Sequence, residues 1–428
     1  MLSPSALGSA LHDAAATTDT APGALLVDLL RGPLGNPERG GTRHTLLAVC
    51  PNSETVARAA LQAAQEAQAP LLFAATLNQV DRDGGYTGWT PAALTEFVDA
   101  EADRLGLTVP VLLGLDHGGP WRKDAHVQRD LDADTAWAET ERSIAACIEA
   151  GYDLLHLDPT GARSPTKTLP VEALVRRTVR LMRHAEAVRH SAGRGPVAYE
   201  VGVEEADGPD GEARFEAYCS QLAAALDDAD LPRPSFVVGD VGTALASPDF
   251  DADRARRLAH IAETKLGALL KGHYTDDVAH PELYPLSGMG GANVGPGLSA
   301  VEAEALQELE ALAHQLGHDT GLYDALRAAV LESGRWRKWL EPNEKGKAFD
   351  ALPDERQRWL VRTGSRYVWT RPEVEAARTR LYETVSAYRD AEAYVHWRVR
   401  TAILSYLHAF NLVGLADRLR EAVSDDAH

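Results

Sequence analysis

Cysteine is scarce in this sequence: its 428 residues include three cysteines, Cys50, Cys147 and Cys219, which lie far apart. Three widely spaced cysteines make neither a disulfide framework nor a zinc ribbon. The first residues also lack the basic segment and apolar core of a secretory signal. We therefore expect a protein of the reducing cytoplasm.

Positive charge is in short supply as well. The chain has 43 Lys and Arg against 63 Asp and Glu, a formal net charge of −20. This balance argues against a nucleic-acid-binding protein and against docking on an anionic membrane. No apolar run reaches the roughly 18 residues of a transmembrane helix. A small anionic substrate is not excluded, because a local basic pocket can exist in an acidic protein.

Eight short apolar runs are present instead, and an amphipathic stretch follows most of them. The runs lie at residues 45–50, 70–76, 109–117, 152–158, 196–203, 235–240, 267–273 and 288–296. Apolar runs without alternation are typical of strands buried on both faces, and strand–helix repetition indicates parallel βαβ units. Eight such repeats predict a (β/α)₈ TIM barrel of the α/β class. The alternative, a doubly wound sheet, normally carries a glycine-rich turn after its first strand, whereas this chain has CPNSET there.

The pattern changes along the chain. We expect an N-terminal arm over residues 1–40, the barrel over 41–320 and a helical C-terminal region over 321–428. The last region would cap the barrel or form an oligomer contact, and a homo-oligomer is expected.

Polar residues follow almost every predicted strand. The active site of a TIM barrel lies at the carboxyl ends of its strands, so these residues would share one rim. Each Asp or Asn alone could equally be a helix N-cap or turn former, but the whole set favours a functional site. The set is Asn52, Asn78, Gln79, Asp116, His117, Asp158, Glu200, Asp240, Lys271, His273, Asp276 and Asn293.

The sharpest local signal is LLGLDHGGP at 112–120, in which Asp116 and His117 close an apolar strand. Neutral imidazole is a good ligand for Zn²⁺ or a similar divalent ion. With Glu200 and His273, His117 would make an open metal site. The alternative is that both histidines are hydrogen-bonded core or loop residues. His156 would lie deeper, as a residue supporting the ligands, with Asp158 at the rim.

Two glycine-containing segments could contact a ligand. The loop NQVDRDGGYTGWTP at 78–91 could close over a bound molecule, with Tyr86 and Trp89 beside its glycines, or form a structural loop. The segment GGANVGPGLS at 290–299 precedes a helix and could bind phosphate through backbone N–H groups, with charge from Arg122 and Lys271; plain turns are the alternative.

Several of these segments together resemble a known family. AVCPNSETVARAAL, ATLNQVDRDGGYTGWTPAAL, LLGLDHGGPWR, AGYDLLHLDPTG, KGHYTDD and NVGPGLS resemble, in order and spacing, the Z-type (GatZ/KbaZ-like) subunit of class II tagatose-bisphosphate aldolase. That family is similar to metal-dependent ketose 4-epimerases. Members have been described as non-catalytic partners of a separate aldolase subunit.

The resemblance implies roles for individual residues. Asp116-His117 matches the family's Asp-His, Glu200 a strand-five glutamate, and His273, Thr275 and Asp276 its His-Ser-Thr-Asp stretch, with Tyr274 in place of the serine. Asn78 and Gln79 match its Asn-Gln. The chain departs from the family at Ala74 and Lys271, where glutamates are expected, and at Asn293, where a lysine is expected. The substrate can therefore differ from tagatose bisphosphate.

The chemistry implied is reversible carbon–carbon cleavage beside a ketose carbonyl, as an aldolase or a 4-epimerase, with zinc or manganese as cofactor. Asp116 is the first candidate for acid–base catalysis, with Asp158 and Asp276 beside it. The expected contacts to a sugar or sugar phosphate come from Asn52, Asn78, Gln79, Arg122, Lys271, Thr275 and Asn293. The alternatives are a non-catalytic stabilising subunit with an aldolase partner and, less favoured, a sugar isomerase.

Overall fold

Eight parallel strands form a closed barrel in the computed structural model, and each strand pairs with the next along the chain before β8 returns to β1. The predicted (β/α)₈ barrel is therefore confirmed. The strands are β1 Leu46–Val49, β2 Leu71–Thr76, β3 Val111–Gly118, β4 Leu154–Leu157, β5 Ala198–Gly202, β6 Phe236–Val238, β7 Leu269–Gly272 and β8 Met289–Val294. The structure describes residues 6–32, 34–35, 42–162, 169–203, 211–245 and 249–426.

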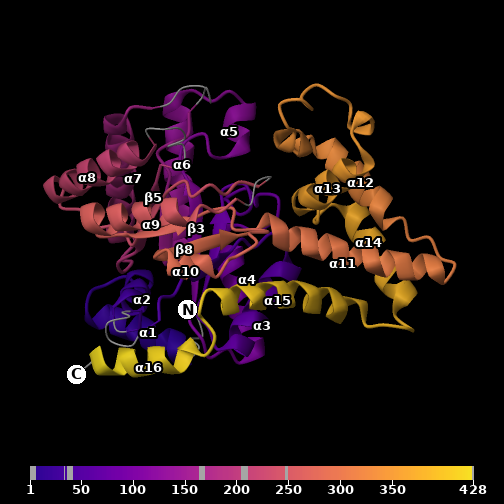
Figure 1. Ribbon diagram of the computed structural model, residues 1–428, viewed down its shortest axis with the longest axis horizontal. Helices are drawn as coiled ribbons and strands as arrows, with labels where there is room; N and C mark the ends of the chain where they lie inside the picture. Colours follow the sequence, from indigo (N-terminus) through magenta and orange to yellow (C-terminus); the bar gives the residue numbers. More distant parts are fainter. Residues whose placement is uncertain are drawn as a thin grey trace.

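Helices follow the strands and cover the outside of the barrel (Figure 1). Their ends are set by local chemistry: Ser53 Oγ accepts the Val56 N–H at the start of α3, and Thr90 Oγ1 accepts the Ala93 N–H at the start of α4. The helices of this layer are α3 Glu54–Ala67, α4 Pro91–Leu105, α5 Asp124–Gln128, α6 Ala133–Ala150, α7 Val171–Ser191, α8 Gly211–Asp228, α9 Ala252–Ile261, α10 Leu283–Leu286 and α11 Pro296–Gln315.

Glycines in β8 make room for side chains of the neighbouring strand β7. A Cβ at Gly290 would lie 2.5 Å from Leu269 Cβ, and one at Gly291 would lie 3.0 Å from Lys271 Cγ. The run GMGGANV is therefore a strand although it is rich in glycine, because its neighbours occupy the space that side chains would need.

The N-terminal segment forms two helices, α1 Ala6–Thr17 and α2 Pro22–Arg31, where the sequence predicted an arm. Helix α2 lies against the amino ends of the strands, since a Cβ at Gly23 would be 3.1 Å from Ala198 Cβ and 3.3 Å from the Asp153 carbonyl oxygen. The last helix, α16 Leu415–Asp426, packs beside α1 (Figure 1).

The C-terminal helices build a second hydrophobic core beside the barrel. They are α12 Leu322–Ser333, α13 Asp354–Gly364 and α14 Pro372–Val385, with short 3₁₀ turns at η3 Arg335–Trp339 and η5 Ser365–Tyr367. The buried side chains of this core run from Ala303 in α11 to Val395 and include Trp336 and Trp369. The expected boundary at residue 320 lies in the loop between α11 and α12.

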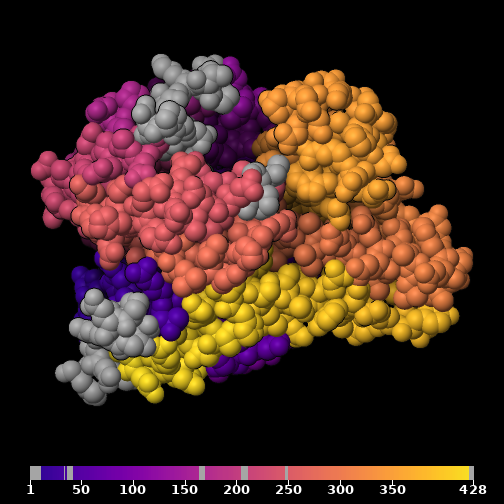
Figure 2. Space-filling model, in the orientation of Figure 1, coloured from indigo at the N-terminus to yellow at the C-terminus, as the bar shows by residue number. Residues whose placement is uncertain are grey.

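Helix α15, Ala391–Ala409, connects the two cores. Its buried stripe recurs at every fourth residue, as one face of a helix requires. The first two members lie in the helical core and the last three in the barrel core; they are Ala391, Val395, Val399, Ile403 and Leu407. The stripe packs the helical region firmly onto the barrel, and the C-terminal segment, yellow in Figure 2, runs along the lower side of the molecule.

None of the helices in the described part of the chain has the length and apolar character that crossing a membrane demands.

The turn after β3 depends on a glycine. A Cβ at Gly119 would lie 1.9 Å from the Asp158 carbonyl oxygen, whereas one at Gly195 would meet open space. We expect Gly119→Ala to force β3 and β4 apart and to lower the free energy of unfolding by about 1–3 kcal/mol. Gly195→Ala should change it by less than about 0.5 kcal/mol. Urea unfolding of both variants measures the difference, and equal stabilities would refute this account of the turn.

Candidate active site

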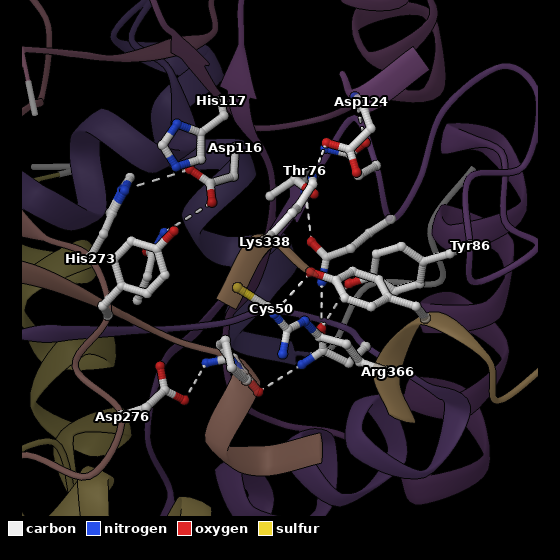
Figure 3. Close-up of a pocket in the computed structure, with 18 of the residues that line it drawn as sticks. Cys50, Thr76, Tyr86, Asp116, His117, Asp124, His273, Asp276, Lys338 and Arg366 are labelled. Carbon is white, nitrogen blue, oxygen red and sulfur yellow. Dashed lines mark hydrogen bonds and ion pairs between the residues drawn. The ribbon is translucent and has the colours of Figure 1, made fainter. Parts of the chain in front are cut away.

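A cavity of about 310 Å³ lies at the carboxyl ends of the barrel strands. Strand ends and βα loops form most of its wall, and η3 and η5 of the helical region form the rest. Figure 3 shows Asp116, His117 and His273 gathered on one side of the pocket, with Tyr86 and Arg366 on another. The lining residues are Cys50, Asn52, Thr76, Asn78, Gln79, Tyr86, Asp116, His117, Arg122, Asp124, His273, Tyr274, Asp276, Asn293, Gly295, Pro296, Lys338, Trp339, Arg366 and Tyr367.

Four side chains that could hold a metal ion converge beside this pocket, and two of them, Asp116 and His273, line it. They come from the ends of four strands and are Asp116, His156, Glu200 and His273, all buried. Their nitrogen and oxygen donor atoms lie within 4.8 Å of one another. His273 Nε2 is 3.2 Å from Glu200 Oε1, and His156 Nδ1 is 2.9 Å from Asp116 Oδ1 and 3.5 Å from Glu200 Oε1.

His117 lies next to this cluster and completes a group of three imidazoles. Its ring centroid is 4.8 Å from that of His273 and 5.0 Å from that of His156. Its Nδ1 is 2.7 Å from Asp158 Oδ2, and the Arg122 Nε is 2.5 Å from the same oxygen. A carboxylate on one imidazole nitrogen is the arrangement that orients a ligating histidine.

Backbone strain accompanies the site. His117 and Tyr274 both line the pocket and have positive φ angles of 50° and 53°. Non-glycine residues rarely adopt this left-handed conformation, and the surrounding structure has to hold them there. The strain aims the end of β3 and the loop after β7 into the pocket.

The carboxylates of the cluster are held in their charged form. Burial would raise the pKa of Asp116, but the neighbouring His117, His273 and His156 lower it well below its usual range. Burial likewise opposes ionisation of Glu200, whose pKa is lowered by the charge of Lys271 and by the two histidines that face it. Ionised carboxylates are the form that binds a metal ion.

The donor set fits a divalent metal. Two imidazoles and two carboxylates meet in one buried volume, and Zn²⁺ and Mn²⁺ accept such nitrogen and oxygen ligands. Glu200 Oε2 is already bound by Lys271 Nζ at 2.5 Å, so Oε1 is the oxygen that faces the histidines. His117, His156 and Asp158 form a second overlapping group.

Two residues predicted to contact substrate lie beneath the pocket rather than in its wall. Lys271 is 1% exposed and forms an ion pair with Glu200 inside the barrel. Thr275 is fully buried, and its N–H donates to the Asn293 carbonyl oxygen.

Three predicted amide side chains line the pocket and also bond to the protein. Asn52 Nδ2 donates to the Gly295 carbonyl oxygen, while its Oδ1 accepts from Gln79 Nε2 and from the Tyr86 hydroxyl. Asn78 Nδ2 donates to the Arg122 carbonyl oxygen, and Asn78 Oδ1 accepts from the backbone N–H of Asp124, the first residue of α5. These bonds fold the 78–91 loop over the strand ends.

Asn293 and Asp276 occupy the β8 side. Asn293 Nδ2 donates to Asp116 Oδ2 at 3.2 Å. Asp276 Oδ1 accepts from the backbone N–H groups of Gly295 and Gly297, and its Oδ2 has no hydrogen-bond partner among the described residues. The carboxylate of Asp276 therefore fills the N-terminus of α11, and the residue also lines the pocket.

The sequence predicts a supporting position for His156, two residues before Asp158 and on the same face of the strand. In the structure His156 lies in the buried cluster with Asp116, Glu200 and His273. Several pocket residues did not emerge from the sequence. Nothing in the sequence marked Lys338, Trp339, Arg366 or Tyr367, because no local pattern connects residues 335–367 to the barrel. Trp89, expected to close over a ligand, packs instead against Phe97 with ring centroids 4.9 Å apart.

Asp276 should make stability depend on pH. Burial raises its pKa to about 6 in the fold, although the Gly297 and Gly295 N–H groups oppose the rise. Because the pKa of Asp276 is lower in the unfolded chain, the protonated carboxyl stabilises the fold relative to the ionised one. This contribution is full below about pH 4 and is lost as the pH rises through 6. We expect Asp276→Asn, which keeps the acceptor oxygen, to become more stable relative to wild type by on the order of 2–3 kcal/mol between pH 4 and pH 7. Chemical unfolding of both proteins measures this. The account would be wrong if the difference in free energy of unfolding between Asp276→Asn and wild type were the same at pH 4 and pH 7.

Comparison with known proteins gives named relatives. The chain is 27% identical over 421 residues to a D-tagatose 6-phosphate 4-epimerase of Agrobacterium fabrum, covering 91% of this chain and 93% of that protein. It is 28% identical over 305 residues to the D-tagatose-1,6-bisphosphate aldolase subunit GatZ of Escherichia coli O1:K1 / APEC, covering 65% of this chain and 70% of GatZ.

Solved structures share the fold. A probable tagatose 6 phosphate kinase from Sinorhizobium meliloti 1021 superposes with a TM-score of 0.71 at 26% identity, over 85% of this chain and all of that chain. The fructuronate-tagaturonate epimerase UxaE from Cohnella laeviribosi superposes with a TM-score of 0.53 at 14% identity, over 86% and 81% of the two chains, which is a likeness of fold alone. Residues 34–223 match the family model described as D-tagatose-1,6-bisphosphate aldolase subunit GatZ/KbaZ-like, the family that the motifs of the sequence resemble.

Proposed function

We propose that the protein is a metal-dependent enzyme that epimerises a ketose or ketose phosphate at C4 by breaking and remaking the C3–C4 bond. The observation that carries this proposal is the buried cluster of two histidines and two carboxylates at the strand ends. The 4-epimerase relative supports the choice of reaction, because its match extends over 91% of the chain and so includes the C-terminal helices.

Glu200 and His273 are the proposed core of the metal site, with His156 and Asp116 as the other donors of the cluster. His117, predicted from the sequence as a ligand, lies beside them and is oriented by Asp158. A divalent ion bound there supplies Lewis-acid stabilisation of the negative charge that develops on the ketose oxygens when the bond breaks.

Asp276 is the proposed acid–base group at C4. Asp276 lines the pocket, its buried oxygen Oδ2 has no hydrogen-bond partner among the described residues, and burial raises its pKa to about 6, close to a working pH. It takes the proton of the C4 hydroxyl as the C3–C4 bond breaks. It returns the proton to the C4 oxygen after the aldehyde has rotated and the bond has re-formed on the other face.

The helical region has a part in this reaction. Tyr86, Trp339 and Tyr367 line the pocket, and the Tyr86 and Tyr367 rings meet edge to face at 5.1 Å. Aromatic walls that keep the aldehyde in place long enough to turn and re-add would separate an epimerase from an aldolase that releases it.

A non-catalytic subunit of an aldolase complex is the second candidate. The GatZ relative and the description of the family model favour it. It predicts no need for a bound metal and a dependence on a partner aldolase.

Metal content tests the first proposal. We expect about one zinc or manganese ion per chain in purified protein by mass spectrometry, and loss of that ion in His156→Ala and His273→Ala, which each remove a ligand. His184→Ala, on the outer helix α7, is the control and should keep the metal. A wild-type protein that takes up neither ion, with all variants folded, would refute the metal site and favour the subunit hypothesis.

Kinetics can distinguish the proposed roles of Asp276, in proton transfer, and Asp116, in metal binding. With D-tagatose 6-phosphate as substrate and NMR as readout, Asp276→Asn should lower kcat by roughly 10²- to 10⁴-fold while retaining the metal, because it removes proton transfer alone. Asp116→Asn should lose metal and activity together. An Asp276→Asn enzyme with wild-type kcat would eliminate Asp276 as the acid–base group, and cleavage products in place of the C4 epimer would identify an aldolase.

A further inference from the structure

Three arginine or lysine side chains line the pocket, and among the described residues two of them are paired with a carboxylate. Arg122 is paired with Asp158, and Lys338 with Asp124. Arg366 is only 4% exposed, yet no carboxylate of the described residues pairs with it. Its guanidinium donates to the Thr363 carbonyl oxygen and, at 2.9 Å, to the Tyr367 hydroxyl, and both partners are neutral.

A buried cation without a counter-charge is costly to maintain. The surroundings of Arg366 hold it in place through its flat face: its Cζ is 4.5 Å from the centre of the Tyr367 ring and 5.1 Å from that of Trp339. Such stacking occupies the faces of the guanidinium and not its edge. The N–H groups that do not donate to Thr363 or Tyr367 therefore remain for an anionic acceptor, either a planar carboxylate or a tetrahedral phosphate.

A second donor lies beside it without a partner. The Trp339 Nε1 atom is buried, and none of the described residues accepts a hydrogen bond from it. Trp339 and Arg366 both line the pocket. The neighbouring Arg335 lies 5.5 Å over the Tyr86 ring and shares Asp124 with Lys338, so cations outnumber carboxylates on this face.

The positions that the sequence suggested for a phosphate are filled by the protein itself. The N–H groups of Gly295 and Gly297 at the start of α11 are bound by Asp276, and Lys271 is bound by Glu200. An anion at α11 would meet the carboxylate of Asp276. On the helical side of the pocket the lining carboxylate, Asp124, is already paired with Lys338.

The two ends of the pocket, with Arg366 at one and Asp116 and His273 at the other, belong to one cavity of about 310 Å³. Figure 3 places Cys50 between Arg366 and the group formed by Asp116 and His273. Burial raises the pKa of the Cys50 thiol, which the charge of Asp116 raises further and that of Arg366 lowers, so both ends act on the same atom.

We propose that Arg366, assisted by the Trp339 Nε1–H, binds the phosphate of a phosphorylated ketose whose reacting carbons lie at the metal-donor cluster. The inference rests on the function proposed above and makes the helical region the part of the molecule that selects substrates by charge. A phosphate fits better than a sugar carboxylate, because its three terminal oxygens can accept from the guanidinium fork and the indole together.

Binding to the metal-loaded full chain tests this without turnover. By isothermal titration calorimetry, Arg366→Gln should weaken binding of D-tagatose 6-phosphate and of inorganic phosphate by roughly 10- to 100-fold, the loss expected for charge-assisted hydrogen bonds. Trp339→Phe removes one N–H and should weaken binding by a smaller factor. Arg337→Gln, at an exposed arginine of η3, the 3₁₀ turn that also holds Trp339, is the matched control and should bind as wild type does.

Kinetics give an independent readout. In Arg366→Gln, kcat/KM should fall by a much larger factor for D-tagatose 6-phosphate than for D-tagatose, and Arg366→Lys should restore part of the difference because it keeps the charge. Metal content and melting temperature of each variant separate a folding defect from a binding defect.

Three outcomes would overturn the inference. The first is equal phosphate affinity in wild type and Arg366→Gln, and the second is absence of phosphate binding in the wild type. The third is tighter binding of D-tagaturonate than of D-tagatose 6-phosphate, which would assign Arg366 to a sugar carboxylate. The first and third leave a metal-loaded chain and thus the proposed reaction intact, whereas a metal-free wild type refutes the reaction itself.

Discussion

The burial of charge at the carboxyl end of the barrel is the constraint on which the site depends. Glu200 and Lys271 have almost no exposed surface, and each charge would be strongly destabilising alone. Their ion pair satisfies one oxygen of Glu200, the two histidines face the other, and Asp116 and Asn293 extend the network. Five strands, β3, β4, β5, β7 and β8, each supply one member or more. The network therefore exists only when the barrel is closed, and closing it brings together, beside the pocket, a set of donors that could hold a metal ion.

The helical region has two physical tasks. Its own core and the α15 stripe give it a rigid attachment to the barrel, so that η3 and η5 are held above the strand ends. Through them it supplies Trp339, Arg366 and Tyr367 to the pocket, and Thr370 Oγ1 donates to the Tyr86 carbonyl oxygen in the 78–91 loop. The residues that the helical region supplies all lie outside the family match, which covers residues 34–223. In the reaction proposed here, barrel residues carry out the chemistry and helical residues choose the substrate.

Much of the fold could be predicted because strands buried on both faces leave a simple trace, a short apolar run followed by an amphipathic helix. The repeat count predicted an eighth strand at β8, although its glycine-rich composition argued against one. It is a strand because its glycines accommodate Leu269 and Lys271 of β7. Strand-end residues such as Asp116, His117 and His273 could be grouped for the same reason: a barrel collects the carboxyl ends of its strands. Their roles as ligands, bases or substrate contacts stay predictions. Lys271 was expected to contact substrate, and its burial against Glu200 could not be foreseen from the position of either residue in the chain.

The sequence by itself determined the barrel, its rim of polar residues and the family of residues 34–223, because each is written in local periodicity or in short motifs. Tertiary structure alone decided which rim residues share one volume, which carboxylate fills the N-terminus of α11, and which cation lacks a counter-charge. Asp276 and Gly297 are 21 residues apart, Glu200 and Lys271 are 71 apart, and Ser299 and Trp369 are 70 apart, yet each pair is in hydrogen-bond contact. Charge balance and burial are properties of such distant pairs. No local pattern encodes them, because they arise only when the chain has folded and water has been excluded.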